Sequence, residues 1–265
     1  MKARSRAKED RALVLRRYPF GESSLVVHLL TPGSGKVHVL AKGAFRPTSG
    51  YYAVFDWFDT LAVGWREQRA SDLGVATRGR IHARRRGLTA TLPRYRAGLA
   101  LLELLDLAAQ PGRDESGLFG LAERWLDLLG SGATDPSVAL VAFDLAFLEN
   151  LGHAPALASC AACGGAVAAP RGKDGRIPFA TGAGGCLCPR CGTEARSAGR
   201  RVESLPVNVV RIAASLAGAD PEHLSRFRVD ARALGQVRAL VERFLDYHLE
   251  TRPRSRSGAR AAATP

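Results

Sequence analysis

The sequence predicts an α+β protein with a five-stranded β-barrel, a helical domain after it, and a cysteine-rich segment inserted among the helices. Three observations support this prediction. Residues 11–86 contain short runs of alternating apolar and polar residues, which are typical of strands. After Arg86 the apolar residues recur every three or four positions, which is typical of helices. Four cysteines form two close pairs between two of the helical segments.

The strand region divides at clusters of turn-forming residues. Pro19 ends the first strand because proline cannot donate a hydrogen bond to a sheet, and turns are predicted at 21–22, 32–35 and 47–50. The predicted strands lie at 13–18, 23–30, 36–42, 54–63 and 73–81. Five short strands without an intervening helical pattern favour a small barrel of the OB type.

The chain is strongly basic, with a formal net charge of +13 from 38 basic and 25 acidic residues. A surface with such an excess attracts polyanions, of which nucleic acid is the most common inside a cell. A genome rich in G and C would explain why arginine outnumbers lysine. It would not explain the net excess of positive charge, so nucleic-acid binding is the favoured interpretation.

A nucleic-acid surface is predicted on the barrel. The strand at 36–42 alternates so that its lysines and histidine share one face, and arginines stand in the first strand and in the following loop. The candidate DNA-binding residues are Arg16, Arg17, Lys36, His38, Lys42 and Arg46. The candidate residues for stacking on bases are Phe20, Phe45, Tyr51 and Tyr52. The alternatives are a solvated outer face for the cations and core packing for the aromatic residues.

The helical region begins with a pattern at 92–109 and continues at 118–129. Asp135 followed by Pro136 is a helix start signal, and that helix ends at Gly152. Helical patterns return at 206–216 and 237–248. The arginine run 84–86 either extends the basic surface or is a solvated linker.

These patterns give a domain organisation with boundaries at changes of period and composition. The last segment holds arginines among small and polar residues without an apolar anchor, which predicts disorder. The predicted parts are a flexible N-terminus (1–10), an OB-fold domain (11–86), a first helical part (87–155), a zinc-knuckle insertion (156–197), a second helical part (198–250) and a disordered basic tail (251–265).

The cysteine pairs predict a zinc site. Cys160 and Cys163 are separated by two residues, as are Cys188 and Cys191, and 24 residues lie between the pairs. Two such turns supply four thiolates to one tetrahedral Zn²⁺, which leaves no open coordination position, so the site is structural. The alternative is redox or disulfide chemistry. Cys186 leaves open which cysteine is the third ligand.

Catalytic patterns are weak. No HExxH, P-loop or GxSxG motif occurs, and Asp56 and Asp59 fall on opposite faces of the predicted strand. The sequence therefore favours a protein that is not an enzyme. No secretory signal or long apolar run is recognised, so a cytoplasmic location without a membrane partner is expected.

Several stretches together resemble the RecO family of bacterial recombination mediators. Residues 12–25 are similar to the family's first hairpin, and residues 29–36 with 41–46 are similar to its next turn and third strand. Residues 151–155 lead into the two cysteine pairs as in the family's zinc knuckle, and residues 247–256 resemble its ending. In that pattern a leucine precedes the third ligand, which favours Cys188 over Cys186.

The resemblance implies a function as well as a fold. It implies binding of single- and double-stranded DNA, annealing of complementary strands, and loading of RecA onto strands coated by single-strand binding protein (SSB) in the nucleoid. RecR, in some members RecF, and the C-terminal tail of SSB are the implied partners. The alternatives from the residues alone are a zinc-ribbon transcription or RNA-binding factor and a nuclease.

Overall fold

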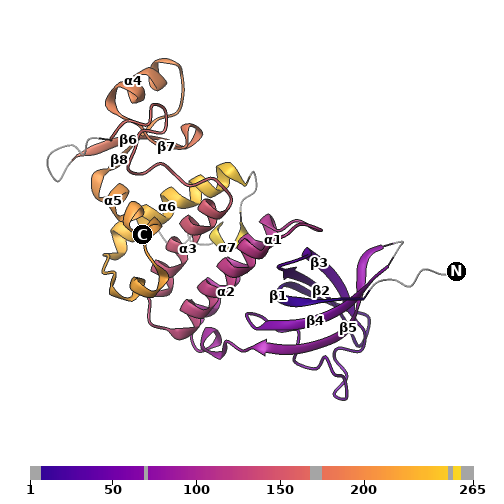
Figure 1. Ribbon diagram of the computed structural model, residues 1–265. Helices are drawn as coiled ribbons and strands as arrows, with labels where there is room; N and C mark the ends of the chain where they lie inside the picture. The colour runs from indigo at the N-terminus through magenta and orange to yellow at the C-terminus, as the bar shows by residue number, and fades with distance from the viewer. Residues whose placement is uncertain (1–6, 69–70, 168–174, 250–252, 258–265) are drawn as a thin grey trace. The chain divides into compact units, whose positions relative to one another are not determined.

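A computed structural model of the protein describes residues 7–68, 71–167, 175–249 and 253–257 (Figure 1). The chain forms two compact units, which divide between Gly132 and Ala133. The division falls inside the segment 87–155, and the first two long helices therefore belong to the same unit as the barrel.

The first unit contains a closed five-stranded barrel, as predicted. The strand order is β1-β2-β3-β5-β4, in which only the β3–β5 pair is parallel. The strands are β1 (Ala7–Phe20), β2 (Ser24–Thr31), β3 (Gly35–Ala41), β4 (Thr60–Gln68) and β5 (Ser71–Ala83). Pairing of β3 with β5 closes the barrel, so none of its strands has a free edge.

The interior of the barrel is filled by alternate residues of every strand. Val27 of β2 lies opposite Val39 of β3, and both are fully buried. Leu61 and Trp65 of β4 belong to the same apolar cluster. The alternation seen in the sequence therefore corresponds to inward and outward faces of the barrel.

The fourth strand begins later than predicted. The aromatic-rich run 54–63 was expected to be one strand, but residues 54–59 form a loop and β4 starts at Thr60. Phe58 has a positive φ of 73°, which interrupts extended backbone. Phe55 and Phe58 are nevertheless buried, Phe55 in the barrel core. The prediction was wrong here because aromatic content indicates burial and does not by itself specify a strand.

Two helices complete the first unit, α1 (Leu92–Ala108) and α2 (Ser116–Ser131), and a short 3₁₀ turn, η1 (Arg86–Thr89), joins them to the barrel. Phe58 packs edge-on against Tyr95 of α1, with ring centres 5.6 Å apart. A Cβ atom at Gly87 would lie 1.9 Å from the backbone oxygen of Gly130, so η1 approaches the end of α2 closely. The helices are therefore packed against the connection that leaves the barrel.

Arg85 links this connection to the barrel and to α2 by hydrogen bonds. It is buried, with 8% of its surface exposed. Its side chain donates to the carbonyl oxygen of Phe58 at 2.8 Å and to Thr60 Oγ1 at 2.9 Å. Its Nε donates to Asp127 of α2 at 2.6 Å, and its backbone N–H donates to Asp59 at 2.8 Å. Both interpretations of the arginine run, as nucleic-acid surface or solvated linker, are therefore wrong for Arg85.

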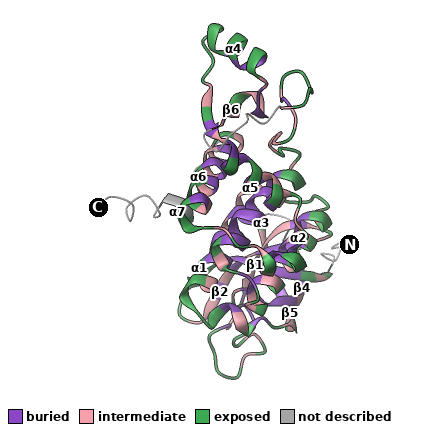
Figure 2. Cartoon of the chain, turned by 90° about the vertical axis from the view of Figure 1, so that its left-hand side faces the viewer, coloured by how far each residue is buried: buried purple, intermediate pink, exposed green. Residues whose placement is uncertain are grey.

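The second unit is built around α3 (Pro136–Asn150), which is buried over most of its surface (Figure 2). The carboxylate of Asp135 accepts hydrogen bonds from the backbone of Ser137 at 2.8 Å and Val138 at 3.2 Å, which confirms the predicted helix start. Helices α5 (Val207–Ala217) and α6 (Ala231–His248) pack against α3, and η3 (Pro221–Arg226) joins them. A short helix, α7 (Arg254–Ser257), lies where a disordered tail was expected.

The cysteine segment contains secondary structure that was not predicted. A three-stranded sheet of order β7-β6-β8 is formed by β6 (Arg176–Ala180), β7 (Gly185–Cys186) and β8 (Glu203–Pro206). The turn η2 (Thr181–Ala183) and the helix α4 (Pro189–Ser197) complete this segment (Figure 1). Among the described residues, no helix combines the length and apolar character that crossing a membrane requires.

Candidate functional site

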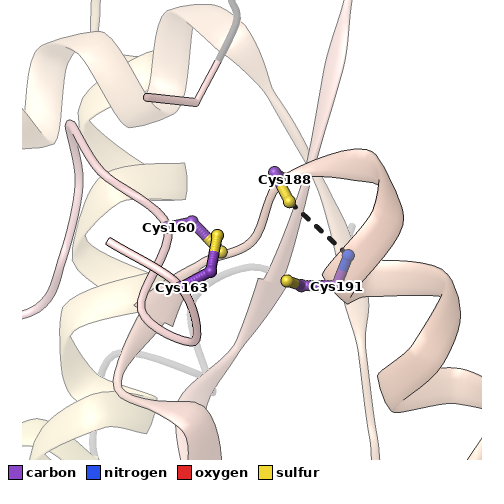
Figure 3. A group of neighbouring side chains, drawn as sticks. All are labelled: Cys160, Cys163, Cys188 and Cys191. Atoms are coloured by element: carbon purple, nitrogen blue, oxygen red, sulfur yellow. Dashed lines mark hydrogen bonds between the residues drawn. The ribbon is translucent and has the colours of Figure 1, made fainter. Parts of the chain in front are cut away.

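Four cysteines of the second unit lie together. Cys160 and Cys163 come from one turn, and Cys188 and Cys191 come from the start of α4 (Figure 3). Their Sγ atoms all lie within 4.8 Å of one another. These are the four residues that the spacing of the sequence predicts as ligands, and the arrangement can hold a metal ion.

The backbone around the sulfur atoms holds this arrangement. Cys188 is the residue that caps α4, and its Sγ accepts a hydrogen bond from the backbone N–H of Cys191 at 3.5 Å (Figure 3). In the other turn the backbone N–H of Gly164 donates to the carbonyl of Cys160 at 2.8 Å. Gly164 has a φ of 70°, a conformation that glycine adopts without steric cost. Each pair is thus fixed by a turn with its own hydrogen bond.

The thiols of the cluster ionise unequally. Burial opposes ionisation of Cys160, but hydrogen bonds from the backbone of Cys188 and Cys163 outweigh it and lower the pKa of Cys160 to about 6. Hydrogen bonding with the Cys188 side chain and burial raise the pKa of Cys191 to about 12. Four thiolates at these separations repel one another, so a bound cation is needed for all four to lose their protons.

Cys186 lies outside the cluster although it is only two residues from Cys188. It is fully buried in β7, where it pairs with Phe179 of β6. Burial and the charge of Cys160 raise the pKa of its thiol to about 11. A buried thiol that resists ionisation is a small apolar side chain.

The barrel residues predicted to bind DNA occupy several different environments. Arg16 of β1 and Lys36 of β3 both form ion pairs with Asp106 of α1, the latter at 3.2 Å. Asp106 has only 7% of its surface exposed. A single buried carboxylate therefore engages both cations and compensates one of their two positive charges.

His38 is stacked on His28 of the neighbouring strand, with ring centres 3.9 Å apart. Burial lowers the pKa of both imidazoles, and each is lowered further by a nearby positive group. Tyr18 and His28 meet edge to face, with ring centres 5.4 Å apart. Both histidines are therefore neutral at physiological pH, and His38 contributes no positive charge there.

Arg17 turns to the opposite side of β1 from Arg16, because consecutive strand residues alternate. Its guanidinium pairs with Asp56 at 3.1 Å, donates to the carbonyl of Phe55 at 3.2 Å and lies over the ring of Trp57. Arg17 therefore fastens the loop between β3 and β4 to the barrel.

Lys42 and Arg46 are the two candidates that remain exposed and form no ion pair within the described part of the chain. They lie in the loop after β3, beside the exposed ring of Phe45. The backbone of Phe45 donates to the carbonyl of Ser23 at 2.9 Å, which holds this loop against the β1–β2 turn. Five exposed residues of this turn and loop are called the barrel rim here: Phe20, Lys42, Phe45, Arg46 and Tyr52.

The four aromatic candidates also differ in how accessible their rings are. Phe20, Phe45 and Tyr52 are 56%, 48% and 60% exposed, so their rings are accessible. Tyr51 donates from its hydroxyl to the carbonyl of Ala76 at 2.9 Å and packs against Phe55. Tyr51 is therefore a structural residue of the barrel.

Sequence reasoning missed Asp106, the residue that forms ion pairs with both Arg16 and Lys36. Asp106 stands within an apolar run of α1, in which Leu104 and Leu105 are fully buried. An acidic residue that follows two buried leucines must find a partner, and this was the available signal.

Comparisons with known proteins agree with one another over nearly the whole chain. Residues 5–85 match the family model described as "Recombination protein O N terminal", and residues 90–257 match "Recombination protein O C terminal". The chain is 33% identical over 247 residues to the DNA repair protein RecO of Thermobifida fusca (strain YX), covering 93% of this chain and 95% of the relative. It is 32% identical to the DNA repair protein RecO of Anaeromyxobacter sp. (strain Fw109-5), covering 91% and 90% respectively. The chain belongs to the RecO family of DNA repair proteins.

Proposed function

We propose that the protein anneals complementary single strands and helps to load RecA onto DNA coated by SSB during recombinational repair. The observation that carries this proposal is the barrel rim on the OB barrel of a RecO-family chain. There, two cations that form no ion pair with a described residue stand among three exposed aromatic rings. Basic groups that neutralise phosphates, with aromatic rings that stack on bases, are the usual means of binding single strands.

The proposed mechanism is electrostatic. Two complementary strands repel each other through their phosphates, and cations on the protein reduce this repulsion while the bases meet. Lys42 and Arg46 are the proposed principal contacts, because Arg16, Arg17 and Lys36 are engaged by carboxylates of the same chain. The reaction needs no bond-breaking chemistry, so we propose a protein without enzymatic turnover.

We further propose that Cys160, Cys163, Cys188 and Cys191 hold one structural Zn²⁺. A Zn–S bond of about 2.3 Å places the sulfur atoms of a tetrahedron about 3.8 Å apart, which fits within the observed 4.8 Å limit. Four thiolates leave no position for water or substrate. The metal would stabilise a segment that has a small apolar cluster of its own, made partly of cysteine and alanine side chains.

The family supplies the proposed partners. These are single- and double-stranded DNA, RecR, in some cases RecF, and the C-terminal tail of SSB. DNA binding would place the protein at the bacterial nucleoid. The alternative of a zinc-ribbon transcription or RNA-binding factor would require a preference for sequence or for RNA.

Annealing of a fluorescently labelled oligonucleotide to its complement at low salt tests the proposal. The wild-type protein should accelerate annealing, and Lys42→Ala with Arg46→Ala should reduce this acceleration. The matched control replaces Arg96 and Arg113 with Ala, which removes two exposed charges of the same unit away from the barrel rim. An annealing rate equal to that without protein would refute the proposal.

A further inference from the structure

An open cleft of about 830 Å³ lies in the second unit, remote in sequence from the barrel. It is lined by the end of β6 with η2, the residues that precede and begin β8, and the last turns of α6. Its volume is within the usual range of ligand sites, about 300–1,000 Å³. The residues used in the argument are Arg200, Arg201, Glu203, Arg243, Asp246 and Tyr247.

Two of the cleft's arginines carry charges that no described residue neutralises. Arg200 and Arg201 are exposed neighbours between α4 and β8, and neither forms an ion pair with any described residue. Arg243 differs, because its Nη2 pairs with Glu203 at 2.9 Å. The Nε of Arg243 is buried and lacks a partner among the described residues, which leaves an unused donor at this cleft. Adjacent free guanidinium groups are suited to phosphate.

The cleft also presents an aromatic ring. Tyr247, in the last turn of α6, lines it and is 56% exposed. This ring and that of His248 meet edge to face, with ring centres 5.1 Å apart and planes at 83°. His248 is in turn stacked on His153, with ring centres 4.5 Å apart. An exposed ring held by contact with a neighbouring ring is a platform on which a planar base can stack.

We infer that this cleft binds single-stranded nucleic acid, with a phosphate at Arg200 and Arg201 and a base on the ring of Tyr247. The inference rests on the proposed annealing function and deepens it. Annealing requires that two strands be held, and the barrel rim with this cleft would hold one each.

The charges that line the cleft favour nucleic acid over an acidic peptide. Glu203, which pairs with Arg243, and Asp246 also line the cleft, so it presents carboxylates as well as cations. A base is neutral and carries N–H donors, so it can lie next to these acidic groups while its phosphate reaches the arginines. The occupant is therefore expected to combine separate anionic and neutral planar parts, as a nucleotide chain does.

The test uses the full-length, zinc-loaded protein and a fluorescently labelled oligothymidylate in anisotropy titrations at several salt concentrations. Wild-type protein should bind two strands. Tyr247→Leu should weaken binding of one of them by roughly 5- to 150-fold, the loss expected for one base–aromatic stack, whereas Tyr247→Phe should not. Replacing Arg200 and Arg201 with Ser should lower the log–log salt slope for that strand by about 1.4, the contribution of two phosphates.

The control replaces Arg211 and Arg232 with Ser, two exposed arginines of the same unit that do not line the cleft. A 5-iododeoxyuridine oligonucleotide provides a direct readout, because photocrosslinking should attach it to Tyr247. If the cleft variants bind and anneal as the wild type does, the inference is wrong while the proposed function stands. If wild-type protein fails to anneal at all, the proposed function itself is wrong.

An oligo-aspartate peptide distinguishes the other class of occupant. If this peptide binds wild-type protein, and its binding is lost in the Arg200/Arg201 variant while oligothymidylate binding is unchanged, the cleft is a peptide site and the inference is overturned. Competition in which oligothymidylate displaces the peptide from the cleft would support it.

Discussion

Replacing Arg85 with Ala should strongly destabilise the first unit. The change removes donors from the carbonyl of Phe58 and from Thr60 Oγ1, which lie 2.8 and 2.9 Å from the guanidinium. It also removes the partner of Asp127 at 2.6 Å. Breaking a buried ionic contact costs about 3–5 kcal/mol. Asp127 is 64% exposed at its side chain and regains water, so we expect the lower part of that range, about 3 kcal/mol.

Urea unfolding monitored by tryptophan fluorescence measures this change, since Trp65 lies in the barrel core. Arg85→Lys should fall between wild type and Arg85→Ala, because an ammonium group keeps the charge but cannot reach all three acceptors in the same geometry. The control is Arg86→Ala, an exposed neighbour that should change the unfolding free energy by less than about 0.5 kcal/mol. If Arg85→Ala costs no more than Arg86→Ala, the structural role of Arg85 is refuted.

Three further outcomes are expected. Cys188→Ser should abolish stoichiometric zinc and destabilise the cysteine segment, whereas Cys186→Ser should retain the metal; metal analysis decides between them. The lowered pKa of His28 and His38 means that the unfolded chain binds protons more readily than the folded chain. The contribution of the two neutral histidines to the unfolding free energy is thus present above about pH 6.5 and lost as the pH falls below it. Replacing both with Phe should therefore flatten the decline in unfolding free energy between pH 8 and pH 5. Asp106→Asn should release the cations paired with it and steepen the salt dependence of single-strand binding; an unchanged slope would show that these cations do not reach DNA.

The sequence predicted those elements whose signals are local. The start of α3 at Asp135 and Pro136 and its end before Gly152 depend on residues within a few positions of each other. The alternation in β2 and β3 likewise reports directly on the inner and outer faces of the barrel. The cysteine spacing identified the four residues that the structure brings together.

The features that the sequence did not predict depend on contacts between distant residues. Lys36 and Asp106 are 70 positions apart, and no local pattern indicates that they meet. The sheet of the cysteine segment was missed because β7 has only two residues and β6 contains Pro178, which is unfavourable for a strand. Alternation along β3 predicted that Lys36 and His38 share a face, but could not show that an acidic residue of α1 would pair with Lys36.

The position of Arg85 has a practical consequence for dissecting the molecule. The N-terminal family model ends at residue 85, yet the first compact unit continues to Gly132. A fragment cut at the model boundary would lose the helix that carries Asp127 and would uncover Phe58, which packs against Tyr95 of α1. Such a fragment would expose an apolar surface and aggregate readily. Isolated-domain experiments on members of this family should therefore extend the N-terminal piece through the equivalent of α2.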